Sequence, residues 1–145
     1  MSESAFHFRK AFPSDIQELE SIRIQSIRSC TIYSENQRRI WSESIPNWTE
    51  LISSTLVSLK DDRPVGFAIA YNQELDFLYV HPAFHGHGIA NTLVSKVEEE
   101  GMRCDCNPYS EKVLKKRGWT FQKNNIKTKD GETFHNKWYV YHPHH

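Results

Sequence analysis

The alternation of apolar and polar residues predicts a strand followed by a helix near the beginning of the chain. Residues 5–11 alternate with the period of a half-buried strand. Residues 13–29 then repeat isoleucine and leucine at helical spacing, and Ser14 and Gln17 have the separation of a capping box. We therefore expect the first helix to begin at this box.

Two shorter helical segments are predicted next. A second capping box, Ser34 with Gln37, opens the largely polar residues 33–44, which we expect to form a small surface helix with two aromatic anchors. Residues 47–54 have the pattern of one or two further helical turns.

Three consecutive strands follow these helices. Residues 55–71 read as two antiparallel strands around a turn at residues 61–64, and residues 74–80 form the third strand. We expect one face of the second strand to carry its large side chains and the other face its small ones. The large face is assigned Val65, Phe67, Ile69 and Tyr71, and the small face Gly66, Ala68 and Ala70.

The remaining third of the chain alternates helices and strands. A glycine turn leads into an amphipathic helix over residues 89–101, which ends at a glycine. Residues 102–107 then predict a short strand and residues 108–118 a helix. Residues 119–142 predict a hairpin around Asp130–Gly131, the strongest short hairpin signal in the sequence.

This order of elements predicts an α/β (α+β) fold built on one central sheet. We expect a mixed, mostly antiparallel sheet of about seven strands with helices on both faces. The chain has 145 residues, a length typical of one domain, so residues 1–145 are assigned to a single domain.

Charge and composition narrow the classes of protein that fit. Lys plus Arg and Asp plus Glu number 18 each, so the chain lacks the broad basic field of a nucleic-acid-binding protein. We find no apolar run of the ~18 residues that a bilayer span needs, and no signal-like start. We expect a soluble cytoplasmic protein with no disulfide, and we place Cys104 and Cys106 on opposite faces of their strand.

Residues 81–90, HPAFHGHGIA, admit several interpretations. The glycines before a helix allow an anion to reach unpaired N–H groups, but the same pattern also fits a plain strand-to-helix connection. A third alternative is a metal site formed by His81, His85 and His87. We expect no metal here, because Pro82 and the helix start direct these histidines apart.

The segment FLYVHPAFHGHGIANTLV resembles the acetyl-coenzyme A motif of the GCN5-related N-acetyltransferases (GNAT). In that motif a Val-x-Pro turn leads to (Gln or Arg)-x-x-Gly-x-(Gly or Ala) and a helix. Val80, Pro82, Gly88 and Ala90 match it, whereas His85 stands where Gln or Arg is usual. The segments YSENQRRIW, RPVGF and KKRGWTFQKN are similar to a group of short bacterial acetyltransferases of unassigned substrate.

The resemblance implies that acetyl-coenzyme A (acetyl-CoA) binds in a gap between the strands at 74–80 and 102–107. Backbone groups of Leu78, Tyr79 and Val80 would pair with the pantetheine as an added strand does. The amide of Asn107 would reach the cofactor arm. The pyrophosphate would be held by His85, Gly86, His87, Gly88, Ile89, Ala90 and Asn91.

Catalytic groups are assigned with their structural alternatives. Asp76, and next to it Glu74, could take the amine proton through water, or Asp76 could instead cap a loop or meet a lysine. Family members often have a tyrosine where this chain has Leu114. Tyr109 could replace that acid, or could simply pack.

The acceptor site is assigned to Tyr33 and Trp41, which could equally be the apolar face of a small helix. The expected function is direct transfer of acetyl from acetyl-CoA to an amine of a small molecule or peptide. The alternative is a non-catalytic acyl-CoA sensor on the same fold. Alternation in residues 134–142 would also suit a strand-mediated homodimer.

Overall fold

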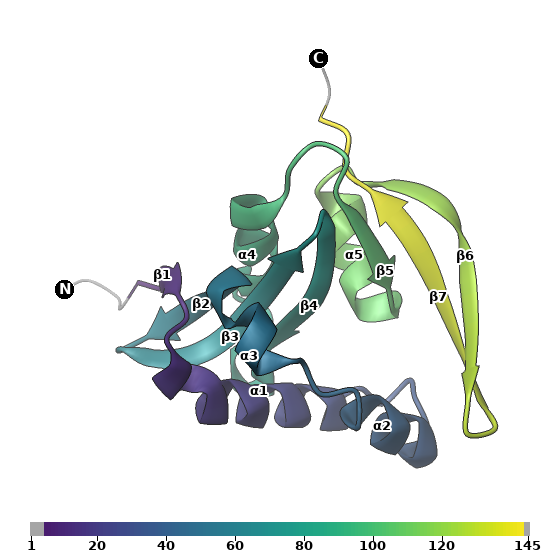
Figure 1. Ribbon diagram of the computed structural model, residues 1–145, viewed down its shortest axis with the longest axis horizontal. Helices are drawn as coiled ribbons and strands as arrows, with labels where there is room; N and C mark the ends of the chain where they lie inside the picture. Colours follow the sequence, from purple (N-terminus) through teal and green to yellow (C-terminus); the bar gives the residue numbers. More distant parts are fainter. Residues whose placement is uncertain (1–4, 144–145) are drawn as a thin grey trace.

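The computed structural model describes residues 5–143, which form a seven-stranded sheet in the order β1-β2-β3-β4-β5-β7-β6 (Figure 1). All neighbouring strands are antiparallel except β4 and β5. This topology confirms the predicted mixed, mostly antiparallel sheet. The strands are β1 His7–Lys10, β2 Thr55–Lys60, β3 Arg63–Tyr71, β4 Glu74–Val80, β5 Arg103–Cys106, β6 Thr120–Lys129 and β7 Glu132–Val140.

Helices cover both faces of the sheet, as predicted. One face packs against the first helix and the other against the fourth and fifth, each around its own apolar cluster. The α-helices are α1 Ile16–Arg28, α2 Glu35–Ser42, α3 Trp48–Leu51, α4 Ile89–Val97 and α5 Pro108–Lys116. No helix within residues 5–143 combines the length and apolarity needed to cross a bilayer.

A bulge in β3 corrects the predicted faces of this strand. Ser58 pairs with Gly66 and Leu59 with Pro64, so Val65 is an extra residue in the ladder. Val65 therefore packs in the cluster around α4, whereas Phe67 packs in the cluster around α1. The predicted common face for these two side chains is wrong, because the extra residue reverses the alternation.

The two predicted capping boxes have different outcomes. Ser34 and Gln37 form theirs at the start of α2, with Gln37 N–H donating to Ser34 Oγ at 3.0 Å. The box predicted at Ser14 is wrong, because a short 3₁₀ turn at Pro13–Asp15 precedes α1. The carboxylate of Asp15 accepts a hydrogen bond from the backbone N–H that opens this turn.

Helix α4 ends earlier than predicted, at Val97 rather than near residue 101. Glu98 leaves the helix with an extended backbone and accepts hydrogen bonds from the Arg117 guanidinium and from the Trp119 indole. This acid joins the end of α4 to the end of α5. It therefore fixes the spacing of the two helices.

The cysteines are free thiols, and all three are buried. Cys104 and Cys106 occupy the same face of β5. The expectation that they would point to opposite faces is wrong, because alternate residues of a strand share a face.

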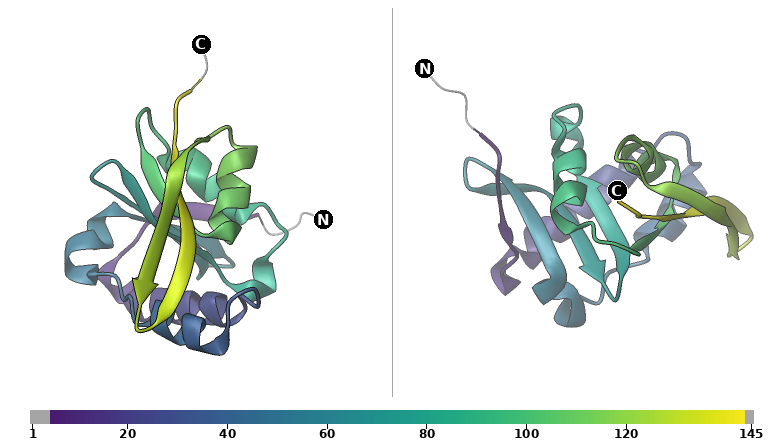
Figure 2. Two further views of the ribbon diagram at one scale, coloured as in Figure 1. Left: turned by 90° about the vertical axis from the view of Figure 1, so that its right-hand side faces the viewer. Right: turned by 90° about the horizontal axis from the view of Figure 1, so that it is seen from above.

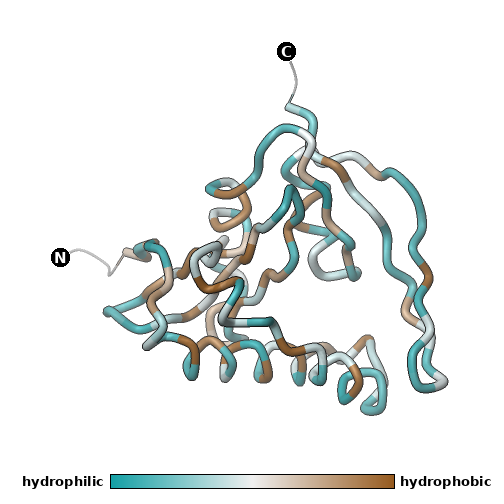
Figure 3. Tube along the Cα trace, in the orientation of Figure 1, coloured by the Kyte–Doolittle hydropathy of each residue, from teal (hydrophilic) through white to brown (hydrophobic). Residues whose placement is uncertain are grey.

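Two tight turns close the β2–β3 and β6–β7 hairpins. The predicted Asp130–Gly131 turn is confirmed, with positive φ at both residues. The turn predicted at residues 61–64 is tighter than expected, since only Asp61 and Asp62 lie between the strands. The β6–β7 hairpin is long, and Figure 2 shows it face-on in its left view. Its outer strand β6 is mostly hydrophilic (Figure 3).

Strands β4 and β5 part almost as soon as they meet. They pair only at Glu74 with Arg103, and Figure 1 shows them diverging beyond this point. A second bulge lies in β4 itself, where Ile69 pairs with Phe77 and Ala70 with Leu75. Asp76 is the extra residue of this bulge. The gap and the bulge are therefore neighbours on the same strand.

Candidate active site

Two cavities lie on either side of the gap between β4 and β5. The first, of about 520 Å³, is walled by β4, α2 and the β6–β7 hairpin and is here called the hairpin cavity. The second, of about 460 Å³, reaches the start of α4 and is called the glycine-turn cavity. Both are lined by Trp41, Leu78, Tyr79, Asn107 and Ser110. A ligand that spans the gap would therefore contact both cavities.

The edge of β4 is open along the gap. His81 N–H donates to Val65 O at 2.8 Å, so His81 faces β3. Because backbone groups alternate sides along a strand, the N–H and C=O of Leu78 and Val80 point away from β3 and into the gap. The backbone of Tyr79 faces β3, and this residue enters the site through its ring.

A left-handed turn connects β4 to α4. Gly86 and Gly88 have φ of 86° and 75°, a conformation that glycine adopts without strain. Ile89 is buried in the core and contributes only its backbone, while Ala90 and Asn91 line the glycine-turn cavity. The first N–H groups of α4 have no partner within the helix and face this turn.

The three histidines around the turn have separate roles. His81 Nδ1 accepts from Ala83 N–H at 3.0 Å and so caps a 3₁₀ turn. Nε2 of His85 lies 2.8 Å from Val80 O, a group that can only accept, so the ring donates there. The ring of His87 packs against Phe6 and lines neither cavity. Within residues 5–143 no three potential ligands are grouped as a metal site would require.

Helix α5 begins at the meeting point of the two cavities. Asn107 Oδ1 accepts from the N–H groups of Tyr109 and Ser110, both at 2.9 Å, and this fixes the amide at the gap. Tyr109 lines the glycine-turn cavity, with its hydroxyl 3.5 Å from Ile32 N–H. Leu114 is fully buried in the core. This position of α5 therefore carries no phenol that could act as an acid.

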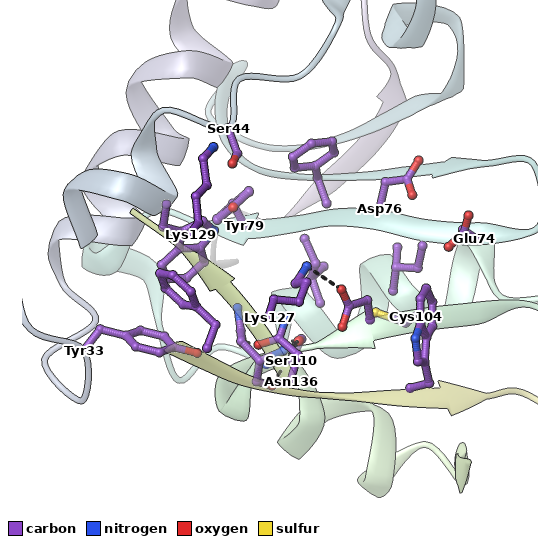
Figure 4. Close-up of a pocket in the computed structure, with 18 of the residues that line it drawn as sticks. Tyr33, Ser44, Glu74, Asp76, Tyr79, Cys104, Ser110, Lys127, Lys129 and Asn136 are labelled. Carbon is purple, nitrogen blue, oxygen red and sulfur yellow. Dashed lines mark hydrogen bonds and ion pairs between the residues drawn. The ribbon is translucent and has the colours of Figure 1, made fainter. Parts of the chain in front are cut away.

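Two carboxylates line the hairpin cavity near the end of β4 that pairs with β5. Figure 4 shows Glu74 and Asp76 together at one end of this cavity. Desolvation, and secondly the charge of Glu74, raise the pKa of Asp76 to about 6. The carboxyl remains accessible to solvent, and near neutral pH most of it is ionised. Its position and pKa suit it to accept a proton in this pH range.

Aromatic rings form the opposite part of the hairpin cavity. Tyr33 packs edge-on against Trp41 at 5.5 Å between centroids and lies 5.8 Å from the ring of Phe134. Trp41 in turn lies 6.1 Å from Tyr79. Desolvation raises the pKa of Tyr33 to about 12, and it also raises that of Tyr79. Both phenols are therefore neutral at physiological pH.

A family comparison agrees with this geometry. A family model described as Acetyltransferase (GNAT) family matches residues 21–119, which include the gap, the glycine turn and α5. The chain belongs to the GNAT acetyltransferase family. No curated protein matches it.

Solved structures of GNAT proteins resemble the whole fold. A GCN5-related N-acetyltransferase from Rhodopseudomonas palustris is 25% identical, with 97% of this chain and 96% of that chain covered and a TM-score of 0.80. Two more distant structures share the fold. The yncA protein from Salmonella typhimurium, solved with its cofactor acetyl-CoA, is 18% identical over 95% and 94% (TM-score 0.68). The PaiA N-acetyltransferase from Thermoplasma acidophilum, in complex with coenzyme A, is 19% identical over 94% and 99% (TM-score 0.68).

In this GNAT protein the hairpin closes over the hairpin cavity. Asn36 Nδ2 donates to Glu132 Oε2 at 2.7 Å, and Gln37 Nε2 donates to Thr133 O at 3.1 Å. These bonds join α2 to the tip of the β6–β7 hairpin. The aromatic contact of Tyr33 supplements them. The cover of the hairpin cavity, formed by α2 and the hairpin tip, is therefore fixed by contacts between these two elements.

A buried arginine holds α2 against α1. Arg23 on α1 is fully buried, pairs with Glu20 at 3.0 Å and donates to Ser42 O at 2.8 Å. The indole of Trp48 donates to the same carboxylate. Arg23 therefore ties α1 to the end of α2, which carries the aromatic wall.

Sequence reasoning missed the residues that the hairpin and β5 bring to the GNAT site. They have the alternating pattern of any exposed strand, and only the curl of the hairpin over β4 places them at a cavity. The charges of Asp105, Lys127 and Lys129 were the one available signal. These strand residues are Asp105, Lys127, Lys129, Phe134 and Asn136, and sequence reasoning also missed Ser44, which follows α2.

The predicted dimer segment also has a different setting. Residues 134–142 include most of β7, which pairs with β6 along its length and with β5 at residues 137–140. The outer edges of the sheet belong to β1 and β6. A strand-mediated contact at this end of the sheet would therefore have to use β6.

Proposed function

We propose that this protein is an N-acetyltransferase that transfers an acetyl group from acetyl-CoA directly to an amine of a small molecule or peptide. The observation that carries the proposal is the open edge of β4. Leu78 and the N–H of Val80 direct backbone groups without a strand partner into a gap that has a cavity on each side, whereas Val80 O accepts from the His85 ring. One cavity ends at a helix N-terminus, and the other ends at carboxylates and aromatic rings.

The residues at the gap suit coenzyme A. An amide-containing chain can pair with Leu78 and Val80 as an added strand does. The pyrophosphate suits the N–H groups of Gly88, Ile89 and Ala90, where the helix dipole favours negative charge. Asn107 and Ser110 lie where the two cavities meet and would contact the chain between them.

The chemistry needs a neutral amine and a polarised thioester carbonyl. Leu78 N–H is oriented to donate to that carbonyl oxygen. Asp76 accepts a proton from the acceptor ammonium group, directly or through one water, and so frees the nitrogen lone pair. Nitrogen bonds to the acyl carbon, the carbon–sulfur bond breaks, and sulfur leaves with its electron pair. Asp76 releases the first proton to solvent, and the excess proton on the acylated nitrogen also passes to solvent.

The departing thiolate has no dedicated acid at the family position, which Leu114 occupies. Thiols have pKa values near 8.5, so a thiolate can leave without one. Tyr109 lines the glycine-turn cavity and is the nearest phenol on α5 that could donate a proton. Its contribution is proposed as secondary to that of Asp76.

The buried Leu114 also favours a second candidate function, an acyl-CoA sensor without turnover. The two functions share cofactor binding and differ in the hairpin cavity, which a sensor does not need. A thiol-release assay over a panel of amines separates them. Turnover that falls in Asp76→Asn supports the enzyme, whereas binding without any release of thiol supports the sensor.

Cofactor binding is tested by calorimetry with acetyl-CoA. We expect saturable binding in the native protein and its loss in Gly88→Glu, which places a side chain and a negative charge at the phosphate site. Gly101→Glu is the matched control, because Gly101 also has positive φ and open space around its Cβ position. Equal binding by the two variants, or no binding by the native protein, would contradict the proposal.

The proposal also covers the domain organisation, the compartment and the partners of the protein. We propose that residues 1–145 act as one catalytic domain in the cytoplasm, a compartment supported by three buried free thiols. No nucleic acid, membrane or metal takes part in the proposed reaction. A homodimer through β6 remains compatible with it, and sedimentation at micromolar concentrations would detect such a dimer.

A further inference from the structure

The hairpin cavity is electrically polarised along its length. Figure 4 shows Glu74 and Asp76 at one end and Lys129 at the other, near the aromatic wall. Lys127 lies between them and its Nζ atom is 2.7 Å from Asp105 Oδ2. Acidic and basic groups therefore occupy opposite ends of one cavity.

The two hairpin lysines differ in their partners. The charge of Lys127 is balanced by Asp105. The side chain of Lys129 makes no hydrogen bond, ion pair or ring contact with any residue in the range 5–143. Among the described lining residues, Lys129 is the cation without an ion-pair partner. Its cross-strand neighbour Glu132 forms no ion pair with it and accepts a hydrogen bond from Asn36 instead, and Ser44 is a nearby hydroxyl.

We propose that the acetyl acceptor is an amine that also carries an anionic group, a carboxylate in the simplest case, and that Lys129 binds this group. The inference rests on the proposed function and names its substrate class. An ammonium group would be attracted to Asp76 and Glu74, and an anion would be repelled by them. The acceptor therefore binds in one orientation, with its amine toward the proton-accepting end.

The size and lining of the cavity agree with such an acceptor. Its volume of about 520 Å³ lies within the ordinary range for small-ligand sites and accommodates an amino acid or a short peptide. Aromatic rings between the charged ends, from Trp41 and Phe134, can cover an apolar body. The anionic group takes no part in bond making. It is unchanged while nitrogen gains the acetyl group and sulfur leaves.

Matched pairs of acceptors test the proposal. Phenylalanine is compared with phenylalaninamide, γ-aminobutyrate with its amide, and O-phosphoethanolamine with ethanolamine, all in the thiol-release assay. The first two pairs probe a carboxylate and the third a phosphate. We expect kcat/KM for the anionic member of at least one pair to exceed that of its partner by about tenfold or more, mainly through KM.

The variants isolate Lys129. In Lys129→Gln the preference for the anionic member should fall by about tenfold, and in Lys129→Glu it should reverse, while the KM for acetyl-CoA stays unchanged. Lys123→Gln is the control, because Lys123 lies on the same strand, is exposed and lines neither cavity. Each amine has the same intrinsic reactivity in every variant, so a changed ratio reports the binding site alone.

Other outcomes overturn the inference. Equal kcat/KM within every pair, or a preference that Lys129→Gln leaves intact, would exclude this role for Lys129. For compounds that are not acetylated, calorimetric binding replaces turnover, and equal affinities within the pairs would overturn it as well. Failure of the proposed function itself has a different signature, which is the absence of acetyl-CoA binding in the native protein.

Discussion

Nζ of Lys127 on β6 lies 2.7 Å from Oδ2 of Asp105 on β5, although β7 runs between these two strands. The pair crosses the cavity side of the curled sheet and so holds the hairpin toward the gap. The second oxygen of Asp105, Oδ1, is buried without a hydrogen-bond partner in the protein. The lysine is therefore the main group that balances this acid at the cavity wall.

Replacement of this lysine should affect acceptor binding more than stability. Lys127→Met removes a pair whose lysine is half exposed, so we expect a loss of at most about 1 kcal/mol in the free energy of unfolding. The KM for the acceptor should change several-fold, because the hairpin wall loosens and Asp105 keeps an uncompensated charge. Kinetics with both substrates measure this, with Lys123→Met as the control. An equal change in the KM for acetyl-CoA would contradict the assignment.

The raised pKa of Asp76 predicts a pH dependence. The ionised carboxylate is the proton acceptor, so kcat/KM should rise through about pH 6 and level off above it. Asp76→Asn should lower kcat about 100-fold and remove this limb. Glu99→Gln, on an exposed acid outside the cavities, should leave both unchanged. An intact limb in Asp76→Asn would assign the ionisation to another group.

Glu74 provides a second test of the same carboxyl. Its negative charge raises the pKa of Asp76, so Glu74→Gln should move the limb to lower pH while activity at neutral pH is largely kept. Rate profiles between pH 5 and 8, roughly the range over which such groups titrate, measure the shift. A limb that moves to higher pH would show that Glu74 does not act on Asp76 through its charge.

At Gly88, the cost of substitution should come from backbone strain and not from steric crowding. Its φ is 75°, and a Cβ atom there would meet nothing within 4 Å. Gly88→Ala should therefore cost about 1 kcal/mol of stability through strain alone. Gly88→Asn should cost less, because asparagine tolerates the left-handed region. Thermal unfolding measures both, and equal losses would contradict this explanation.

The ion pair of Asp15 with Arg9 predicts how stability responds to acid. A hydrogen bond from Arg9 is the main cause that lowers the pKa of Asp15 below 3.8. The group is ionised in both states above the unfolded value, so its stabilisation is complete there and is lost as pH falls through the folded value. Asp15→Asn should cost about 1–2 kcal/mol at neutral pH and flatten the acid limb. Asp130→Asn, in an exposed turn, is the control, and equal acid limbs would contradict the prediction.

The periodic pattern of the sequence predicted the strands, the principal helices and the Asp130–Gly131 turn, because each depends on neighbouring residues. The pattern predicted helix ends wrongly where a tertiary contact outweighed the local sequence preference. Asp15 replaced Ser14 at the start of α1 because it also binds Arg9. Glu98 ended α4 early because its carboxylate is bound by α5 and the following tryptophan.

The site divides in the same way. The glycine turn and Asp76 lie within one contiguous segment, and a motif can identify them. Lys129 and Asp105 come from strands separated in sequence from that segment, and they reach the cavity only because the hairpin curls over β4. No local pattern encodes that curl. The family resemblance therefore indicated the cofactor side of the site more completely than the acceptor side.

Because β4 and β5 pair only at Glu74 with Arg103, the sheet consists of two parts, β1–β4 and β5–β7, that are joined at one residue pair. A ligand bound along the gap like an added strand would connect the two parts. Ligand binding would then be linked to the cooperative unfolding of the protein. At a concentration 100 times its Kd, a ligand adds about 2.7 kcal/mol to the stability of the protein. Amide hydrogens of Leu78 and Val80 should then exchange more slowly. In the cell, the supply of the acyl donor would set how long this protein resists proteolysis.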